Sequence, residues 1–390
     1  MGLAGLDVAI IVAYLVFAVG LGFYFSRSNT STEAFFLGSR DLPGWALGLS
    51  LLSTSISSNS FLAVPAYSYA SDFGLLLKDA VLPIPAAVAA LLVVPFFRQE
   101  GMAGRWQGRQ PWGRKAGGTA PWGSAFEFLE DRFGKACRRY AALCYVCMQM
   151  VRTSSILYLV SIPVTLFTGL SGEVAIVATA CFVACYSTLG GVRAVVFTDV
   201  VQAAILLGGG IGTVLVIASR LPNGFSTILA DGAEAHKFNL IAGGRSDFSL
   251  RDRTVWSVMA TGLIAHFSSY TAGQDCVQRY LAAKTLYEAR KAVVICALLS
   301  IPTWSFFNFV GVALYSFYRH NPVRLSRLSG LEPFVLRGAC LVGHIDQFCW
   351  RNRSWCCDEC GCRTGRWTRS RQTRSFRTSL PKSSPRAWQE

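Results

Sequence analysis

The stretch SLLSTSISSNSFLAVPAYSYA, residues Ser50–Ala70, has the length and hydropathy of a membrane helix but a polar interior. The eight residues from Ser53 to Ser60 include five Ser, one Thr and one Asn, and Pro65 follows. Hydroxyl side chains compete for backbone hydrogen bonds. At membrane depth, a helix breaks only where it is buried in protein or lines a wet cavity. The stretch therefore predicts either a broken helix at a binding site or a helix that packs closely through small residues.

The whole chain is too apolar for a soluble protein. Of its 390 residues, 52% are hydrophobic and 15% are charged, whereas a soluble domain carries about 25% charged residues. The first apolar run lacks a basic leader and a small-residue cleavage site, so we expect it to be retained rather than removed as a signal peptide. The composition predicts an all-α polytopic membrane protein. We expect eight spanning helices: Leu6–Phe25, Trp45–Ala70, Leu75–Phe97, Ala141–Leu166, Val174–Thr188, Val195–Ala218, Trp256–Ala272 and Ala292–Phe317.

The formal net charge of +15 is unevenly placed along the chain. The segments Arg98–Arg139 and Arg279–Lys291 and the turn at Arg193 are basic, whereas Tyr69–Lys78 and Thr168–Glu173 are nearly free of basic residues. Short basic loops face the cytosol. We therefore expect these basic segments inside, the N-terminus outside, and the chain in the lipid bilayer of the plasma membrane.

Two segments differ in composition from the helical regions 1–98 and 123–322. Residues 99–122 are rich in Gly, Trp and Arg without periodicity, and from Arg351 onward there are ten Arg or Lys against three acidic residues. We expect 99–122 to be an aberrant insert. For the tail 323–390, an out-of-frame or disordered segment is expected, with a genuine isoform as the alternative.

The cysteines do not predict a metal site. The run CCDECGC at Cys356–Cys362 lacks the second half of a four-ligand zinc site. Several other cysteines lie in or beside predicted helices, where a free thiol behaves as a small apolar group. Neither zinc nor nucleic-acid binding by the basic tail is expected beside eight membrane helices.

Three further polar features fall at or near membrane depth. The stretch YSTLGGVRAVVFTDVVQAAI places a Gly-Gly turn before Thr198 and Asp199, which either cap a helix or mark a functional site. His266, in a polar-interrupted helix, is either a ligand contact or a hydrogen-bonded interior residue. Arg152 stands near the middle of YVCMQMVRTSSILYLVSIPV, where an unpaired guanidinium is costly.

Arg152 therefore needs an anionic partner. A guanidinium matches a carboxylate bidentately. The partner is either a protein carboxylate, for which Asp79 and Asp199 are the nearest candidates, or the carboxylate of an anionic substrate.

Three passages in order, AFFLGSRDLPGWALGLSLLSTSISSNSF, GGVRAVVFTDVVQ and QDCVQRYLAAK, resemble the sodium/solute symporter family. This family includes sodium–glucose, iodide, proline and sialic acid cotransporters. The likeness covers Leu6 to Pro322 apart from residues 99–122. It implies the leucine-transporter-like inverted-repeat fold, preceded by one extra helix. The second repeat would be incomplete, since only its first two helices have counterparts.

The resemblance also implies a sodium site. The carbonyls of Ser53 and Ile56 match the family's ligands at the break in core helix one, while the hydroxyls of core helix eight have no counterpart. Asp199 matches the family's acid that is linked to a second sodium site or to ion release.

For substrate, Arg152 and Tyr158 match the spacing of an Arg and a Tyr in the sialic acid symporters. The implied substrate-binding residues are Ser55, Ser57, Ser58, Ser60, Arg152 and His266. No Glu occurs in LLLKDAVLPIPAAVAAL, which argues against a simple glucose-type pocket.

We therefore expect sodium-coupled symport of a small organic solute by alternating access, with a carboxylated solute such as a sialic acid favoured. A glucose-type cotransporter and a non-transporting truncated isoform or sensor are the alternatives. The chain is not expected to be an enzyme, because only His266 of its four His lies at membrane depth. Sodium is the expected coupling ion, and no other cofactor is expected.

Overall fold

A computed structural model describes residues 5–27, 31–56, 59–98, 124–240 and 254–321. The predicted insert and the predicted tail lie outside these residues. The regular elements within them are helical. In chain order they are α1 (Gly5–Ser26), α2 (Thr32–Leu37), the 3₁₀ helix η1 (Gly38–Arg40), α3 (Gly44–Ser55), the π-helical turn η2 (Asn59–Ala63), α4 (Val64–Ala70), α5 (Leu76–Ala80), α6 (Pro83–Val88), the π-helical turn η3 (Ala89–Val93), α7 (Val94–Arg98), α8 (Ala125–Phe133), α9 (Lys135–Thr168), α10 (Gly172–Arg220), α11 (Phe225–Glu234), α12 (Val255–Ala272), α13 (Gln274–Ala282) and α14 (Leu286–His320).

Among the described residues, five helices are long and apolar enough to cross a membrane, and the bent pair α3 and α4 raises this number to six. The five are Val8–Ser26, Leu76–Arg98, Lys135–Thr168, Ser187–Arg220 and Leu286–His320. Two predicted spans are not among these five. Val174–Thr188 corresponds to a shorter apolar helix, Gly172–Cys185, and Trp256–Ala272 corresponds to α12. The all-α membrane class is confirmed, while the count of eight stays a prediction.

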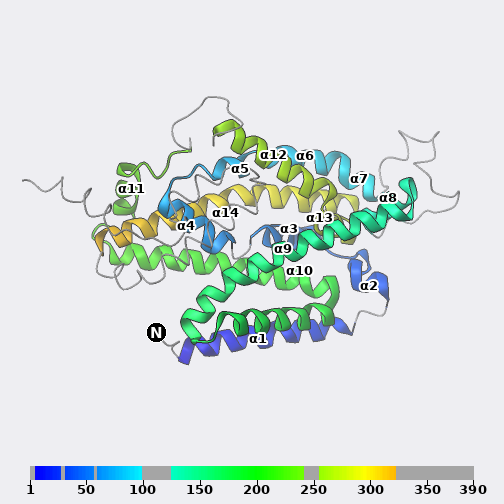
Figure 1. The fold of residues 1–390 in the computed structure, drawn as a ribbon, viewed down its shortest axis with the longest axis horizontal. Coiled ribbons are helices and arrows are strands. Elements are labelled where there is room, and N and C mark those ends of the chain that lie inside the picture. Colours follow the sequence, from blue (N-terminus) through cyan, green and yellow to red (C-terminus); the bar gives the residue numbers. More distant parts are fainter. Residues whose placement is uncertain (1–4, 28–30, 57–58, 99–123, 241–253, 322–390) are drawn as a thin grey trace, which may run out of the picture. The chain divides into compact units, whose positions relative to one another are not determined.

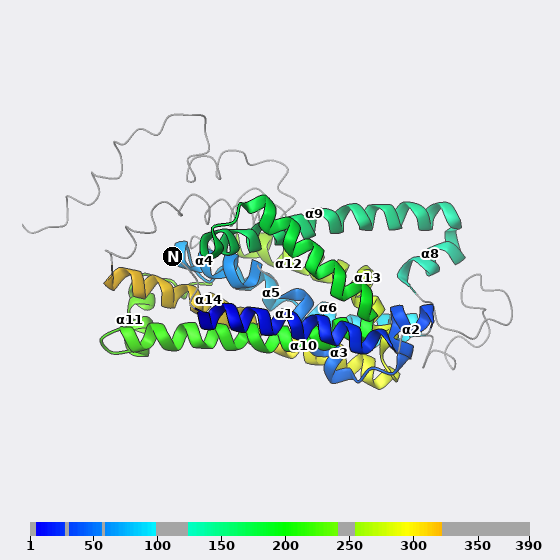
Figure 2. The ribbon, with the colours of Figure 1, turned by 90° about the horizontal axis from the view of Figure 1, so that it is seen from below.

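Helix α14 is the centre of the described bundle (Figure 1). It packs against α3, α4 and α10, and the largest buried apolar cluster draws most of its residues from α3, α13, α14 and the segment from α6 to α7. On another side, α1 lies along α10 (Figure 2). The side chains of Ile10 and Val16 on α1 are largely exposed, as expected for a helix that faces lipid.

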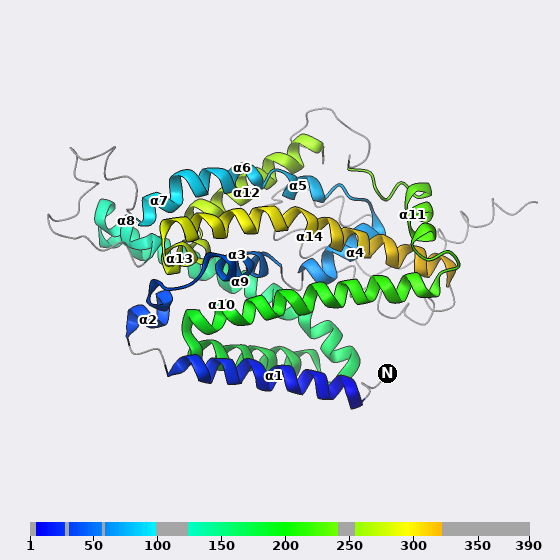
Figure 3. The same ribbon diagram turned by 180° about the vertical axis from the view of Figure 1, so that it is seen from behind.

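The predicted inner segments meet at one end of the bundle. Helices α2, α8 and α13 lie at this end, and α11 lies at the opposite end (Figure 3). Arg193 Nε donates to the Gly38 carbonyl at 3.1 Å, and the Arg98 guanidinium donates to the carbonyls of Tyr280 and Ala283 at 3.0 and 2.7 Å. The described parts of the basic segments thus share one end, while the orientation of that end towards the cytosol stays a prediction.

The start of α3 is tied to the chain that follows α13, in what we call the α3–α13 joint. Leu42 forms an isolated parallel bridge with Ala283. One residue before α3 lies Pro43, and the first N–H of the helix, on Gly44, donates to Glu288 Oε2 at 2.6 Å. A carboxylate here satisfies an orphan donor and complements the helix dipole. The joint therefore connects two segments far apart in the sequence.

Helix α10 is two helices joined at a glycine. Gly191 has φ 61° and ψ −166°, a conformation that residues with a side chain rarely adopt. The sequence prediction of a Gly-Gly turn before a second helix is therefore confirmed. Thr198 and Asp199 lie about two turns beyond it, where α10 packs against α3.

Candidate functional site

The predicted break in the first core helix is present. Helix α3 ends at Ser55, and Ile56 takes an extended conformation with φ −92° and ψ 119°. The arms Gly44–Ser55 and Ser60–Ala70 differ in direction by 61°. Two hydroxyls bond back to the first arm, Thr54 Oγ1 to the Ser50 carbonyl at 2.8 Å and Ser55 Oγ to the Leu51 carbonyl at 3.1 Å. The hydroxyls thus stabilise the last turn before the break.

Only some of the predicted hydroxyls can be placed. Ser55 is exposed and lies beside a cavity at the break, whereas Ser60 on the second arm is fully buried. Ser57 and Ser58 lie outside the described residues. Ser53 is half-buried and Ile56 is buried.

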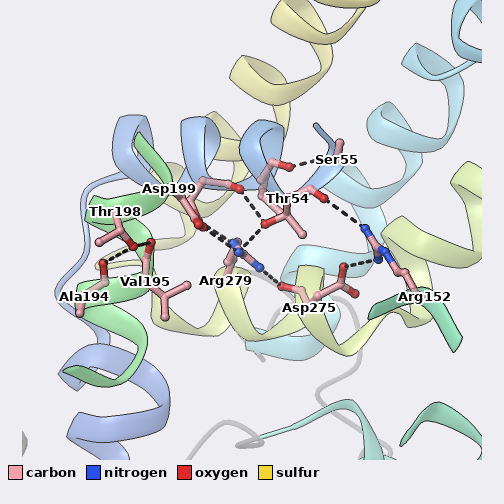
Figure 4. A network of polar contacts seen from close by, with 11 residues as sticks. Thr54, Ser55, Arg152, Ala194, Val195, Thr198, Asp199, Asp275 and Arg279 are labelled. Carbon is pink, nitrogen blue, oxygen red and sulfur yellow. Dashed lines mark hydrogen bonds and ion pairs between the residues drawn. The ribbon is translucent and has the colours of Figure 1, made fainter. Parts of the chain in front are cut away.

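Asp199 lies in a polar network that joins three elements (Figure 4). Its Oδ2 accepts a hydrogen bond from Ser50 Oγ of α3 at 2.5 Å and one from the Arg279 guanidinium of α13 at 3.1 Å. The Arg279 side chain is 11% exposed and that of Asp199 is 15% exposed. Arg279 also donates to Ser50 Oγ at 2.8 Å and to Thr54 Oγ1 at 2.5 Å. A buried acid and a buried base thus compensate each other beside the helix break.

Arg152 reaches the same break from α9. One of its nitrogens donates to the Thr54 carbonyl at 3.1 Å, and another lies 3.8 Å from Asp275 Oδ2. The predicted protein partners of Arg152 were Asp79 and Asp199, and both are wrong. Asp199 pairs with Arg279, because α13 rather than α9 brings a cation beside it.

Asp79 is occupied as well. His266 Nε2 on α12 lies 3.2 Å from Asp79 Oδ1 on α5. The two helices approach closely at Gly262, where an added Cβ would lie 2.2 Å from the Lys78 carbonyl. The His266 Nε2 is buried and makes no hydrogen bond within the described residues, so both predicted roles of His266, ligand contact and interior residue, stay predictions.

Two cavities flank the Arg279 network. The first holds about 40 Å³, and its lining includes Arg152. The second holds about 210 Å³. Leu51, Thr54, Ser55, Arg152, Ser269, Tyr270, Asp275 and Cys276 line the first. Phe35, Phe36, Ser187, Gly191, Val192, Val195, Gln278 and Arg279 line the second. His266 lines neither.

Sequence reasoning missed Asp275 and Arg279 as site residues. Both stand in the stretch QDCVQRYLAAK, one helical turn apart on α13, and the Arg279 guanidinium also donates to the Asp275 carbonyl at 2.8 Å. The available signal was an acid and a base four residues apart after a helix break. Among the described residues, no group of His, Cys, Asp and Glu is arranged to hold a metal ion, and Cys356–Cys362 lies outside them.

Comparison with known proteins bears on the family and the fold of this chain. The chain is 30% identical over 321 residues to the sodium/sialic acid symporter SiaT of Proteus mirabilis, covering 81% of this chain and 60% of that protein. It is 27% identical to the sodium/glucose cotransporter of Vibrio parahaemolyticus, covering 80% of this chain and 56% of that protein. The chain thus spans about three-fifths of the length of these relatives.

A solved structure of a Na⁺-coupled sialic acid symporter, in a substrate-bound, outward-open state described as revealing a novel Na⁺ site, superposes with a TM-score of 0.71. The two chains are 29% identical, and the match covers 81% of this chain and 62% of that one. The leucine-transporter-like fold is thereby confirmed. The family model for the sodium:solute symporter family matches residues 35–322. The relatives are sodium-coupled transporters rather than enzymes, and the chain belongs to the sodium:solute symporter family.

Proposed function

We propose that this chain takes part in sodium-coupled symport of a small carboxylated solute, such as a sialic acid, across the plasma membrane by alternating access. The observation that carries the proposal is the position of Arg152. Its guanidinium lines a cavity at the break between α3 and α4, next to the backbone and hydroxyl of α3.

Arg152 is suited to bind a carboxylate. A guanidinium has five N–H donors, and with the described residues this one makes a single hydrogen bond and one ion pair at 3.8 Å. A solute carboxylate could displace the distant Asp275 and form two parallel hydrogen bonds with Arg152. The hydroxyl of Ser55 lies in the same cavity lining and would contact the rest of the solute.

A glucose-type substrate is less supported by this site. A hexose carries no charge, so it could not replace Asp275 as the ionic partner of Arg152. Among the relatives, the sialic acid symporter SiaT is matched at 30% identity and the glucose cotransporter of Vibrio parahaemolyticus at 27%.

Sodium would bind near the same break. The last carbonyls of α3 have no partner within their own helix, and oxygen ligands suit hard cations. We propose the carbonyls of Ser53 and Ile56 as ligands, with Asp199 as an acidic ligand or release group. Discontinuous helices in transporters coordinate sodium in this manner.

Transport also requires the cavity to open. At about 40 Å³, it has room for a few water molecules but not for a nine-carbon acidic sugar. Movement of α13 away from α3 would enlarge it, since Asp275 and Cys276 form one of its walls.

The test is uptake by the full chain in proteoliposomes. We expect labelled N-acetylneuraminate to accumulate when sodium outside replaces choline, and Arg152→Ala to abolish this uptake. Arg138→Ala is the matched control, because Arg138 lies on the same helix with the same 45% side-chain exposure but pairs with Glu130 away from the break. Folded protein without sodium-dependent uptake would instead support the non-transporting alternative.

A further inference from the structure

The Arg279 guanidinium is surrounded by oxygen acceptors. Its Nε lies 2.8 Å from Ser50 Oγ, and one terminal nitrogen lies 2.5 Å from Thr54 Oγ1 and 3.1 Å from Asp199 Oδ2. The other terminal nitrogen donates to the Asp275 carbonyl at 2.8 Å. The first three of these oxygens come from α3 and α10, whereas the cation comes from α13.

The hydroxyl protons in this set point away from Arg279. Ser50 Oγ gives its proton to Asp199 Oδ2, and Thr54 Oγ1 gives its proton to the Ser50 carbonyl. Each hydroxyl has a single proton and two lone pairs. Both hydroxyls therefore present lone pairs to the guanidinium, together with one carboxylate oxygen.

Two neutral oxygens and one anionic oxygen, which all contact one guanidinium, are ligands of the kind that hard cations take. We propose that Ser50 Oγ, Thr54 Oγ1 and Asp199 Oδ2 form a cation site that Arg279 and a sodium ion occupy in turn. Arg279 is then a tethered cation that fills the site when sodium is absent. This inference rests on the proposed sodium coupling and adds ligands and a competitor to it.

The structure provides a place for the displaced side chain. Arg279 lines the 210 Å³ cavity, which also has Gln278 and Phe36 in its walls. Helix α13 is a separate nine-residue helix, because Gly273 ends α12 in an extended conformation with φ −64° and ψ 119°. A small rotation of α13 would therefore move the guanidinium without rebuilding α3 or α10.

Competition of this kind would couple sodium to the position of α13. With Arg279 in place, the ion pair and hydrogen bonds hold α13 against α3 and α10. With sodium in place, the charge of Asp199 is balanced without α13. Sodium binding must supply the free energy that displaces Arg279, and this lowers the sodium affinity. The two cations compete for one site, so their binding is coupled.

The test is equilibrium binding of ²²Na⁺ to the purified full chain, with choline chloride keeping the ionic strength constant. We expect Arg279→Gln to lower the sodium dissociation constant about tenfold, within the range typical of coupled sites. Arg279→Lys should lower it less, because an ammonium still competes but makes fewer hydrogen bonds. Arg290→Gln is the control, since Arg290 donates to the Ala90 carbonyl, away from Asp199, and its loss should leave the constant unchanged.

Added guanidinium chloride should displace ²²Na⁺ from Arg279→Ala at lower concentration than from the wild type. This second measurement, and Arg279→Lys, remain available if Arg279→Gln does not fold. An unchanged or raised dissociation constant in folded Arg279→Gln and Arg279→Lys overturns the tethered cation and leaves sodium coupling intact. No sodium binding by any folded variant overturns both proposals.

Discussion

Asp199 and Asp231 are two carboxylates with similar partners in different surroundings. Each carboxylate accepts a hydrogen bond from a serine, Ser50 in one case and Ser316 in the other. Each also has basic partners. For Asp231 these are Arg319, with a nitrogen 3.3 Å from Oδ1, and His320, with Nε2 3.0 Å from Oδ2.

The two sites differ in where the base comes from and whether it reaches water. Arg319 and His320 belong to the continuous helix α14, and their side chains are 38% and 39% exposed. Arg279 belongs to the separate helix α13 and is 11% exposed. If Asp231 is removed, water can solvate Arg319 and His320. If Asp199 is removed, the charge of Arg279 stays buried without its acidic partner. The Asp231 site is thus suited to fastening α11 to α14, and the Asp199 site to responding to a change in charge.

The largest predicted effect is that of Asp199→Ala. Removing one partner of a buried ion pair costs about 3–5 kcal/mol, because the other charge is left unpaired. We expect the double variant Asp199→Ala/Arg279→Met to recover most of this loss. Thermal unfolding in detergent without sodium measures both variants. Equal unfolding temperatures for the single and double variants would mean that Arg279 finds water, and the contrast with Asp231 would fail.

Asp231→Ala is expected to cost about 2 kcal/mol, the size of one or two hydrogen bonds to a charged group. Its bases are partly exposed, so the loss is smaller than at Asp199. Hydrogen exchange should speed up in α11 and leave Ser50–Thr54 unchanged. Faster exchange throughout α3 would show that the two sites are coupled.

Lys237, which follows α11, gives the folded chain a pH-dependent stability. Burial lowers the pKa of Lys237 below its ordinary value of 10.5, with nearby Asp72 opposing this shift in smaller part. As the pH rises through the lowered pKa towards 10.5, the folded chain releases this proton before the unfolded chain does, so stability rises. The neutral amine still donates to the carbonyls of Tyr69 and Ser71, now 2.8 and 2.9 Å away.

We therefore expect the wild type to gain thermal stability relative to Lys237→Gln over this alkaline range. The difference between the two unfolding temperatures, measured in steps of pH, isolates the effect from other titrating groups. A difference that stays flat or falls with pH would contradict the assignment.

The smallest effect is expected for Arg319→Gln. Glu234, its nearest partner at 2.9 Å, has a side chain that is 68% exposed, and exposed pairs contribute about 0.2–1 kcal/mol. The loss should shrink further in high salt. A loss as large as that of Asp231→Ala would show that Arg319, rather than Ser316 or His320, fastens α11.

The features read correctly from the sequence are local ones. The break after Ser55 follows from hydroxyls that bond back to their own helix, and the turn at Gly191 follows from a conformation that glycine adopts easily. The placement of Arg152 beside the break was implied by the family resemblance.

The pairings could not be read in the same way. Arg279 was assigned to a basic inner segment and Asp275 was given no role, because their four-residue spacing is a weak signal that solvated charges on a helix also show. Their partners lie on α9, α3 and α10, and only the packing of those helices decides that Asp199 meets Arg279 and Asp79 meets His266. The partners of these charged residues thus become known only from the tertiary structure.

The α3–α13 joint limits how the described helices can move relative to one another. The Leu42 N–H donates to the Ala282 carbonyl at 3.2 Å, the Lys284 N–H donates to the Leu42 carbonyl at 3.1 Å, and Glu288 holds Gly44. These bonds lie at the end of the bundle expected to face the cytosol, whereas Arg279 meets Ser50 and Thr54 further along α3. If the contacts of Arg279 with α3 and α10 were broken, the α3–α13 joint would remain intact and act as a hinge. Helices α3 and α13 would then separate at the end away from the joint. Opening towards the cytosol would also require the hydrogen bonds of the joint to break. The order in which these bonds and the Arg279 contacts break would decide which end of the bundle opens first.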